Sequence, residues 1–419
     1  MKIIYISSAC PIDEIDKINN HLKKKMQVSS IKYHNNLING FLENNINIYS
    51  IYGLPISKKI CNKIIWKTKK IKKDKCEYIQ AGFLNLPILK NISVNITIRK
   101  IIKKILQFEK EEIVIIFDGA YISIYPTIKK YSSQLKVFQI VADVYDYMAK
   151  VDNKSNYNDL VVKIVRKYVS CCNKKMTGYI FLNKNMGNLY NTNNYVVVEG
   201  ISTKKNFEKI KNINNKKNIM YAGGLFDKFG VKNLIEAFMK IDNKNYELSL
   251  YGYGDLDNYI KEKAKIDKRI QYFGMQDIET VIKAEQCADI LINPRPTNLE
   301  FQKYSFPSKI IEYMSSGTPV LTTKVEGMPA EYDNYLFYID DYSIDGLKCK
   351  IEDIINLDDN VKDRVGIEAY NFIQNSKSPK KQAEKILNFI NSIEEKNEKN
   401  MWYISYYYYY YIYSIKIIN

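Results

Sequence analysis

Residues 303–323, KYSFPSKIIEYMSSGTPVLTT, combine residue types that could bind a ligand rich in phosphate and hydroxyl groups. Proline suits the first turn of a helix, so Pro307 predicts a helix start whose free N–H groups, near Ser308 and Lys309, form an anion site. The Lys309 ammonium would add a full charge against a bound diphosphate. The Glu312 carboxylate, about one turn later, can accept hydrogen bonds from two sugar hydroxyls, although an exposed helix position is the plain structural alternative.

Paired glycines form a second candidate anion site. Gly223 and Gly224 end the strand predicted at 218–224 and precede a predicted helix. Because they carry no side chains, their N–H groups can approach a phosphate closely, and the following helix adds the positive end of its dipole. Gly252 and Gly254 repeat the pattern after the next strand, where a plain tight turn explains them equally well.

Short apolar, β-branched runs alternate with helix-like segments along the whole chain. Runs without polar alternation are typical of strands buried on both faces, and alternating βα order indicates a doubly wound parallel sheet. In the first half, strands are predicted at 2–7, 46–53, 112–118, 136–141, 178–182 and 195–200, with helices at 31–43, 95–109 and 156–176. In the second half, strands are predicted at 218–224, 246–254, 269–274, 288–294 and 318–323, with helices at 231–241, 256–266, 277–286 and 307–316. We therefore expect an α/β protein with two Rossmann-like units that face each other across a cleft.

A polar, basic stretch interrupts this alternation and sets the domain boundaries. We expect an N-terminal Rossmann-like domain at 1–201, a linker at 202–217, a C-terminal Rossmann-like domain at 218–379, a helix at 380–397 that packs back on the N-terminal domain, and a Tyr-rich tail at 398–419. The tail is uncharged from 401 to 415, which is too short to span a membrane. It is either an aromatic anchor in the membrane interface or an extension that need not pack, and we favour the extension.

The charge balance predicts a basic surface, because 63 Lys and Arg residues face 46 Asp and Glu residues, a net charge of +17. Nine lysines lie in residues 57–75, around Ile60, Ile64, Ile65 and Trp66. Such a mixture of positive charge and apolar anchors suits the surface of an anionic membrane, and a solvated loop is an equal alternative. No nucleic-acid-binding motif accompanies the charge, so we expect no nucleic-acid partner.

The seven cysteines are odd in number and share no short spacing, which argues against a disulfide framework and a zinc cluster. We expect a reducing cytoplasmic location. The first residues lack the pattern of a secretory signal, and no run of 18 or more uncharged apolar residues occurs. Peripheral contact with the inner face of the membrane remains compatible with this prediction.

The segment IIEYMSSGTPVLTT, with ADILINP before it and EGMPAEY after it, resembles the C-terminal domain of the retaining glycosyltransferases of family 4, which have the GT-B fold. The likeness is close over 218–340 and looser in the first domain, through VADVYDYM, IFLNKNM and VVVEGI. The segment KYSFPSK is similar to enzymes of capsule, exopolysaccharide and lipopolysaccharide assembly. The resemblance implies that the second domain binds a nucleoside-diphosphate sugar as co-substrate and that the first selects a glycan or lipid-linked acceptor. It implies no cofactor and no catalytic metal.

Several positions depart from the family's pattern. Its Glu-x7-Glu motif keeps its second member as Glu312, which the resemblance places on the ribose, but the first falls on Tyr304. Glu300, four residues earlier, is the candidate to reach the donor sugar instead. The usual first-domain histidine has no counterpart, and Asp143 or Asp146 is the candidate for its place.

The family's phosphate site also differs. Its arginine falls on Gly224 and its lysine on Phe229. Lys228, Lys309 and Arg295 are the residues that could supply the missing charge, next to Gly223, Gly224 and Ser308.

The resemblance implies sugar transfer to a hydroxyl with retention of configuration, in which the leaving phosphate itself deprotonates the acceptor. Three alternatives stay open. A GT-B protein that binds nucleotide sugars without turnover would show binding but no transfer. A basic nucleic-acid-binding protein would bind DNA or RNA in a salt-sensitive way. A nucleotide-sugar epimerase would act without an acceptor.

Overall fold

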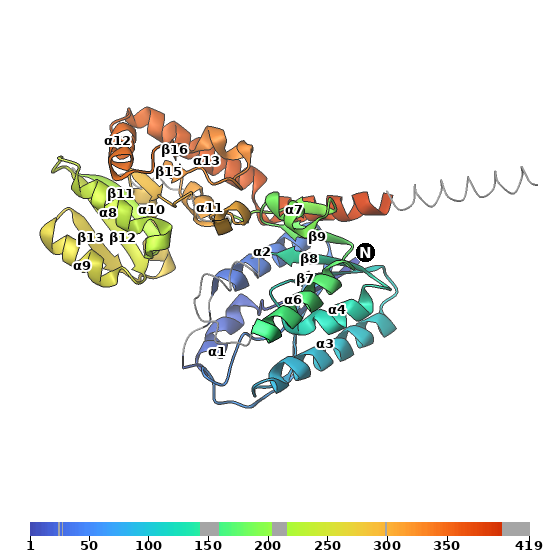
Figure 1. The fold of residues 1–419 in the computed structure, drawn as a ribbon. Helices are drawn as coiled ribbons and strands as arrows, with labels where there is room; N and C mark the ends of the chain where they lie inside the picture. Colours follow the sequence, from blue (N-terminus) through green and yellow to red (C-terminus); the bar gives the residue numbers. More distant parts are fainter. Residues whose placement is uncertain (24–25, 27, 143–158, 203–215, 298–299, 396–419) are drawn as a thin grey trace, which may run out of the picture.

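A computed structural model of the chain describes residues 1–23, 26, 28–142, 159–202, 216–297 and 300–395. Figure 1 shows two α/β units, each built around one large sheet, and a last helix that returns to the first unit. Strands and helices mostly alternate as expected from the sequence, but the strands from residue 47 to residue 84 follow one another without a helix between them.

The first unit contains an eight-stranded sheet with the strand order β10-β9-β8-β7-β1-β2-β5-β4. Its strands are β1 (Lys2–Ser7), β2 (Asn47–Tyr52), β4 (Lys69–Lys73), β5 (Cys76–Gln80), β7 (Ile113–Asp118), β8 (Lys136–Val141), β9 (Gly178–Phe181) and β10 (Tyr195–Val197). Neighbouring strands are parallel except β4 and β5, which are antiparallel. The central strands β1 and β7 are buried almost throughout, as expected for apolar strands covered on both faces.

Helices cover this sheet. They are α1 (Ile15–Asn19), α2 (Val28–Glu43), α3 (Leu89–Phe108), α4 (Tyr125–Tyr131), α6 (Asp159–Asn173) and α7 (Asn185–Tyr190), with the 3-10 turns η1 (Ile12–Glu14) and η2 (Ile122–Ile124). In α3, the buried aliphatic residues recur at helical spacing, at Val94, Ile98, Ile102 and Ile105. A short antiparallel pair, β3 (Ile65–Trp66) and β6 (Phe83–Leu84), lies next to the start of α3.

The second unit contains a six-stranded parallel sheet with the order β13-β12-β11-β14-β15-β16. Its strands are β11 (Lys217–Gly224), β12 (Tyr246–Tyr253), β13 (Ile270–Gly274), β14 (Ile290–Asn293), β15 (Val320–Thr323) and β16 (Phe337–Ile339). Its helices are α8 (Val231–Met239), α9 (Asp257–Ile266), α10 (Ile278–Cys287), α11 (Lys309–Met314), α12 (Ile344–Ile355) and α13 (Asp359–Ser376), with the 3-10 turns η3 (Asp227–Phe229), η4 (Glu300–Tyr304) and η5 (Ala330–Tyr335). Separate apolar cores fill the two faces of this sheet.

A last helix, residues 379–395, joins the core of the first unit although it follows the second in sequence. Its Phe389 ring packs edge-on against Phe138 of β8, with ring centroids 5.8 Å apart. Figure 1 shows this helix beside α7 and β9. The chain crosses between the units at two places that lie together, because the Ser202 amide donates to the Lys377 carbonyl at 2.8 Å.

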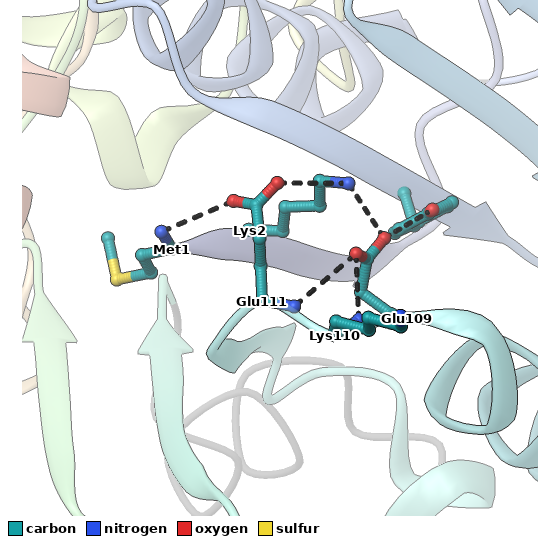
Figure 2. Close-up of polar contacts among 6 residues, drawn as sticks. Met1, Lys2, Glu109, Lys110 and Glu111 are labelled. Carbon is teal, nitrogen blue, oxygen red and sulfur yellow. Dashed lines mark hydrogen bonds and ion pairs between the residues drawn. The ribbon is translucent and has the colours of Figure 1, made fainter.

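Ion pairs close the amino-terminal edge of the first sheet (Figure 2). The Lys2 Nζ lies 2.8 Å from the Glu109 carboxylate and 3.2 Å from that of Glu111, which also pairs with the terminal amine at 3.5 Å. The Tyr49 hydroxyl donates to Glu109 at 2.9 Å. The hydrogen bond from Lys2, with that from Tyr49, lowers the pKa of Glu109 to about 2.

The lowered pKa of Glu109 predicts a pH-dependent contribution to stability. The stabilisation is fully present above the ordinary glutamate pKa of about 4.3 and is lost as the pH falls toward about 2. Urea unfolding of Glu109→Gln should therefore show a lower midpoint than wild type at pH 7, and the difference should shrink between pH 5 and pH 3. Glu43→Gln, at the exposed end of α2, is the control and should show no such convergence. A difference that stays constant with pH would contradict the prediction.

The lysine-rich segment 57–75 is partly ordered into strands instead of forming a loop throughout. Trp66, on which the membrane interpretation of this segment depended, is 6% exposed and stacks on Phe83 at 5.9 Å. It is therefore a core residue and offers no aromatic anchor to a membrane. None of the described helices has both the length and the apolar content needed to cross a bilayer.

Candidate functional site

The carboxyl ends of the central strands in the second sheet bring the predicted donor-binding residues together. The strand β11 ends at Gly223 and Gly224, and its neighbour β14 leads into Arg295. The helix α11 is fixed beside them, because the Tyr313 hydroxyl accepts from the Ala222 amide at 2.8 Å and donates to the Ala222 carbonyl at 2.9 Å. The helix α11 therefore packs beside the end of β11, while the anion site predicted between the glycine turn and the start of this helix stays a prediction.

Glycine is required at these strand ends for two different structural reasons, one at Gly224 and one at Gly252. A Cβ on Gly224 would lie 2.8 Å from Phe226 and 3.0 Å from Phe229, so the two rings can cover the turn only because it has no side chain. Gly252 has a φ of 125° and packs on the Gly223 carbonyl, which a Cβ would approach to 1.8 Å. Gly252 thus supports the shape of the turn, as the plain-turn alternative expected.

Arg295 is the most unusual charge in the site. Its guanidinium lies over the Phe229 ring, 4.6 Å from the centroid, and its Nε has no hydrogen-bond partner among the described residues. Burial lowers the pKa of Arg295 from its usual value, although an arginine stays protonated at neutral pH. A partly buried guanidinium with an unpartnered Nε is costly unless an anion binds there. By contrast, Arg269 pairs with Asp267 at 2.7 Å.

Two lysines of the predicted donor site are described, Lys228 before η3 ends and Lys309 at the start of α11. The Lys228 Nζ lies 5.5 Å from the centroids of both Phe226 and Phe229, so Phe229 links it to the Arg295 side of the site. On α11, the Lys309 Nζ pairs with Glu312 at 2.9 Å, and both side chains are about one third exposed. Lys309 and Glu312 therefore neutralise each other here, which the sequence interpretation, with separate roles for them, did not foresee. Ser308 is exposed at the helix start and its side chain makes no cap hydrogen bond.

The structure does not test the predicted catalytic acids. Asp143 and Asp146 lie outside the described residues, and Glu300 begins η4 without a described side chain. Tyr304, at the position where the family motif has its first glutamate, packs against the apolar cluster of the first unit that contains Phe181. A tyrosine in this contact joins the two units and provides no carboxylate for a sugar.

A buried ion cluster lies where the chain passes between the two units, and the sequence did not predict it. Lys377, at the end of α13, pairs with Glu199 of the first unit and, at 2.6 Å, with Glu331. The Tyr332 hydroxyl donates to the same Glu199 oxygen at 2.9 Å. Lys377 and the Glu199 side chain are 2% and 1% exposed. No spacing pattern could have revealed this cluster, because it joins residues far apart in the chain.

The first unit also contains a buried polar chain, Tyr5–His34–Asp118. The Tyr5 hydroxyl lies 2.7 Å from His34 Nδ1, and His34 Nε2 lies 3.1 Å from the Asp118 carboxylate. Burial alone would raise the Asp118 pKa, but the hydrogen bond and charge of His34 outweigh it and lower that pKa. All three side chains are buried.

Comparisons with known proteins agree with this architecture. Residues 202–378 match the family model described as Glycosyl transferases group 1. A comparison with curated protein sequences found no match. Among the described residues, no group of three His, Cys, Asp or Glu side chains could hold a metal ion.

Solved structures show the fold. A sucrose-phosphate synthase from Thermosynechococcus elongatus matches with a TM-score of 0.65 at 14% identity, over 94% of this chain and 100% of that one. HepE from Anabaena in complex with UDP matches with a TM-score of 0.60 at 12% identity, over 94% and 100%. The lipopolysaccharide outer core galactosyltransferase WaaB, in its apo form, matches with a TM-score of 0.58 at 14% identity, over 94% and 99%. The predicted α/β architecture with the GT-B fold is confirmed.

Proposed function

We propose that this protein is a glycosyltransferase that moves a sugar from a nucleoside-diphosphate sugar to a hydroxyl of a glycan or glycolipid, with retention of configuration, in surface polysaccharide assembly. The observation that carries the proposal is Arg295, a partly buried cation beside the end of β11 whose Nε has no partner among the described residues. A diphosphate supplies the negative charge that this arrangement lacks. The family match over 202–378 and the GT-B fold support a nucleotide sugar as its source.

In the proposed reaction, negative charge builds on the diphosphate as the glycosidic bond breaks. Groups already aimed at that charge lower the barrier, because they need no reorganisation during the reaction. Arg295 and the amides of Gly223 and Gly224 fill this role, with Lys228 and Lys309 adding positive charge at the edge. The departing phosphate oxygen takes the proton from the acceptor hydroxyl on the same face of the sugar. No protein base or metal ion is required in this scheme.

Glu312 would bind the ribose hydroxyls of the donor. In the free protein it pairs with Lys309 at 2.9 Å. Donor binding would exchange that ion pair for two contacts with the ligand, the carboxylate on the ribose and the ammonium on the diphosphate. Both side chains are about one third exposed, so the ion pair is weak enough to exchange at little cost.

A binding protein without turnover is the second candidate, because Tyr304 replaces the family's first glutamate and packs into the interdomain contact. The two candidates differ in a direct assay. Purified protein is incubated with UDP-, GDP- and ADP-sugars, with and without glycan or glycolipid extract and with EDTA, and the released nucleoside diphosphate is measured. The transferase releases it in an acceptor-dependent, EDTA-insensitive way from one donor class. Tight binding without release from any donor would instead support the silent protein.

Glu312→Gln should reduce nucleotide-sugar affinity and transfer at least about tenfold, because a hydrogen bond to a charged group contributes about 1.5 to 3 kcal/mol. The matched control is Glu352→Gln on α12, whose carboxylate is similarly exposed and also faces a helix lysine, at 3.9 Å. Titration calorimetry and initial rates measure both variants. Unchanged values for Glu312→Gln would remove this residue from the donor site.

A further inference from the structure

An apolar surface on the outside of the first unit is not explained by the fold or by the proposed donor site. It consists of seven side chains that are 39% to 77% exposed, namely Ile64, Ile65, Leu84, Ile88, Leu89, Ile92 and Ile96. We call it the α3 surface. Figure 1 shows α3 on the side of the first unit that faces away from α11 and α13, so the described part of the second unit does not cover it.

Hydrogen bonds make these residues one continuous surface. Ile65 of β3 pairs directly with Leu84 of β6. The Leu84 amide donates to Ser93 Oγ of α3 at 3.1 Å, and that hydroxyl donates to the Leu89 carbonyl at 2.7 Å. The two-stranded sheet is thereby fixed against the first turns of α3. Leu89, Ile92 and Ile96 follow at spacings of three and four residues and share the exposed face of the helix.

The backbone holds one of these side chains outward under strain. Ile88 precedes α3 with a φ of 64° and is 77% exposed. This region is a genuine outlier for a β-branched residue. Observed strain of this kind is more common where a position has a function than at an arbitrary loop position.

Lysines surround the α3 surface without acidic neighbours in sequence. Residues 53–73 and 81–108 contain no Asp or Glu. The exposed face of α3 continues from Ile96 to Lys100 and Lys103. Further exposed lysines outside β4 are Lys58, Lys59, Lys63, Lys67 and Lys104. By contrast, three of the four lysines of β4 pair with acids of the first unit, such as Lys69 with Glu14 at 2.6 Å. The positive charge beside the apolar residues is thus available to an external partner.

We propose that the α3 surface docks the protein on an anionic lipid bilayer. Apolar side chains that enter the interface, next to lysines that meet acidic headgroups, are the combination that gives stable peripheral binding. A second copy of this chain fits less well, because two such lysine-rich faces would repel each other. The inference needs no enzymatic activity, and if the proposed transfer is correct it favours an acceptor carried in the membrane.

Flotation of the full-length protein with lipid vesicles tests the proposal. Binding is compared for phosphatidylcholine alone and phosphatidylcholine with phosphatidylglycerol, at low and high salt. Wild type should bind only the anionic vesicles and lose most binding at high salt. Ile88→Asp with Ile92→Asp should reduce the partition coefficient at least about tenfold. Lys100→Gln with Lys103→Gln should reduce it about fivefold per lysine.

The matched control is the exposed end of α9 in the second unit, with Ile266→Asp and, separately, Lys265→Gln with Lys268→Gln. These control variants should bind vesicles like wild type. All the proteins compared carry the same C-terminal tail, so the tail cannot cause a difference between them. The proposal would be overturned if the α3-surface variants bound vesicles as well as wild type does. It would also be overturned if wild type bound neutral and anionic vesicles equally well. So would absent vesicle binding together with a wild-type dimer that Ile88→Asp with Ile92→Asp converts to a monomer. Nucleotide release from a donor in solution is measured in parallel, so that a failure of the proposed function is seen separately.

Discussion

Arg295→Met should reduce sugar transfer by about 100-fold to 1,000-fold, the loss typical when one preorganised donor to a developing negative charge is removed. The guanidinium has no protein partner at Nε and lies beside the glycine turn. In the proposed site it therefore meets the diphosphate directly. Initial rates at saturating donor measure the effect, and calorimetry with the nucleoside diphosphate measures the accompanying loss of affinity.

A second readout separates a ligand-binding role of Arg295 from a structural one. Removing this guanidinium should leave the melting temperature of the free protein unchanged or raise it, because no carboxylate among the described residues forms an ion pair with it. The nucleotide-induced rise in melting temperature should disappear in the same variant. Arg364→Met, at an exposed position of α13, is the control and should keep both activity and the nucleotide shift. A large drop in the melting temperature of free Arg295→Met would show that Arg295 holds the fold together.

Lys377→Met should destabilise the protein by about 3 to 5 kcal/mol, because it leaves the Glu199 carboxylate buried without its cation. Glu199 keeps only the Tyr332 hydroxyl as a partner of its Oε1, and its Oε2 has no partner among the described residues. Urea unfolding followed by fluorescence measures the loss. Two transitions are expected if the units unfold separately once this contact is broken.

A double variant tests whether the buried charge is the cause. Lys377→Met with Glu199→Gln should recover most of the lost stability, because a neutral amide costs much less to bury than an unpaired carboxylate. Lys381→Met is the control, since its Nζ pairs with Glu384 on an exposed surface at 2.9 Å, and its effect should stay within about 0.5 kcal/mol. Additive losses in the double variant would mean that packing, and not charge, explains the effect of Lys377.

The overall architecture was predictable because buried parallel strands leave a strong pattern. The continuous apolar runs of β1, β7 and β14 could be assigned from their residue types alone. The edge strand β4 was missed, because four of its five residues, KKIKK, are lysines and resemble a solvated loop. Charges on an edge strand prevent pairing with other chains, so its composition reflects its position in the sheet. The start of α3 at Leu89 was also missed, because its first turns expose apolar side chains.

The candidate site was only partly predictable. The Gly223–Gly224 turn and the start of α11 could be identified, because glycine pairs and a proline at a helix start have local physical reasons. The Phe229 ring lies between Arg295 and Lys228. Its position depends on how η3 folds over β11, and no sequence spacing predicts these contacts. The ion pair between Lys309 and Glu312 could have been predicted, because residues three apart on a helix are neighbours.

The most direct test of the diphosphate site is a crystal structure of the protein with UDP or, if calorimetry shows that it binds better, GDP. We predict that the two phosphates lie between the Gly223–Gly224 amides and the Arg295 guanidinium, with the ribose on Glu312 and Lys309 turned toward the phosphates. Phosphates bound elsewhere, or an Arg295 side chain that keeps its place over Phe229 without contacting them, would contradict this account.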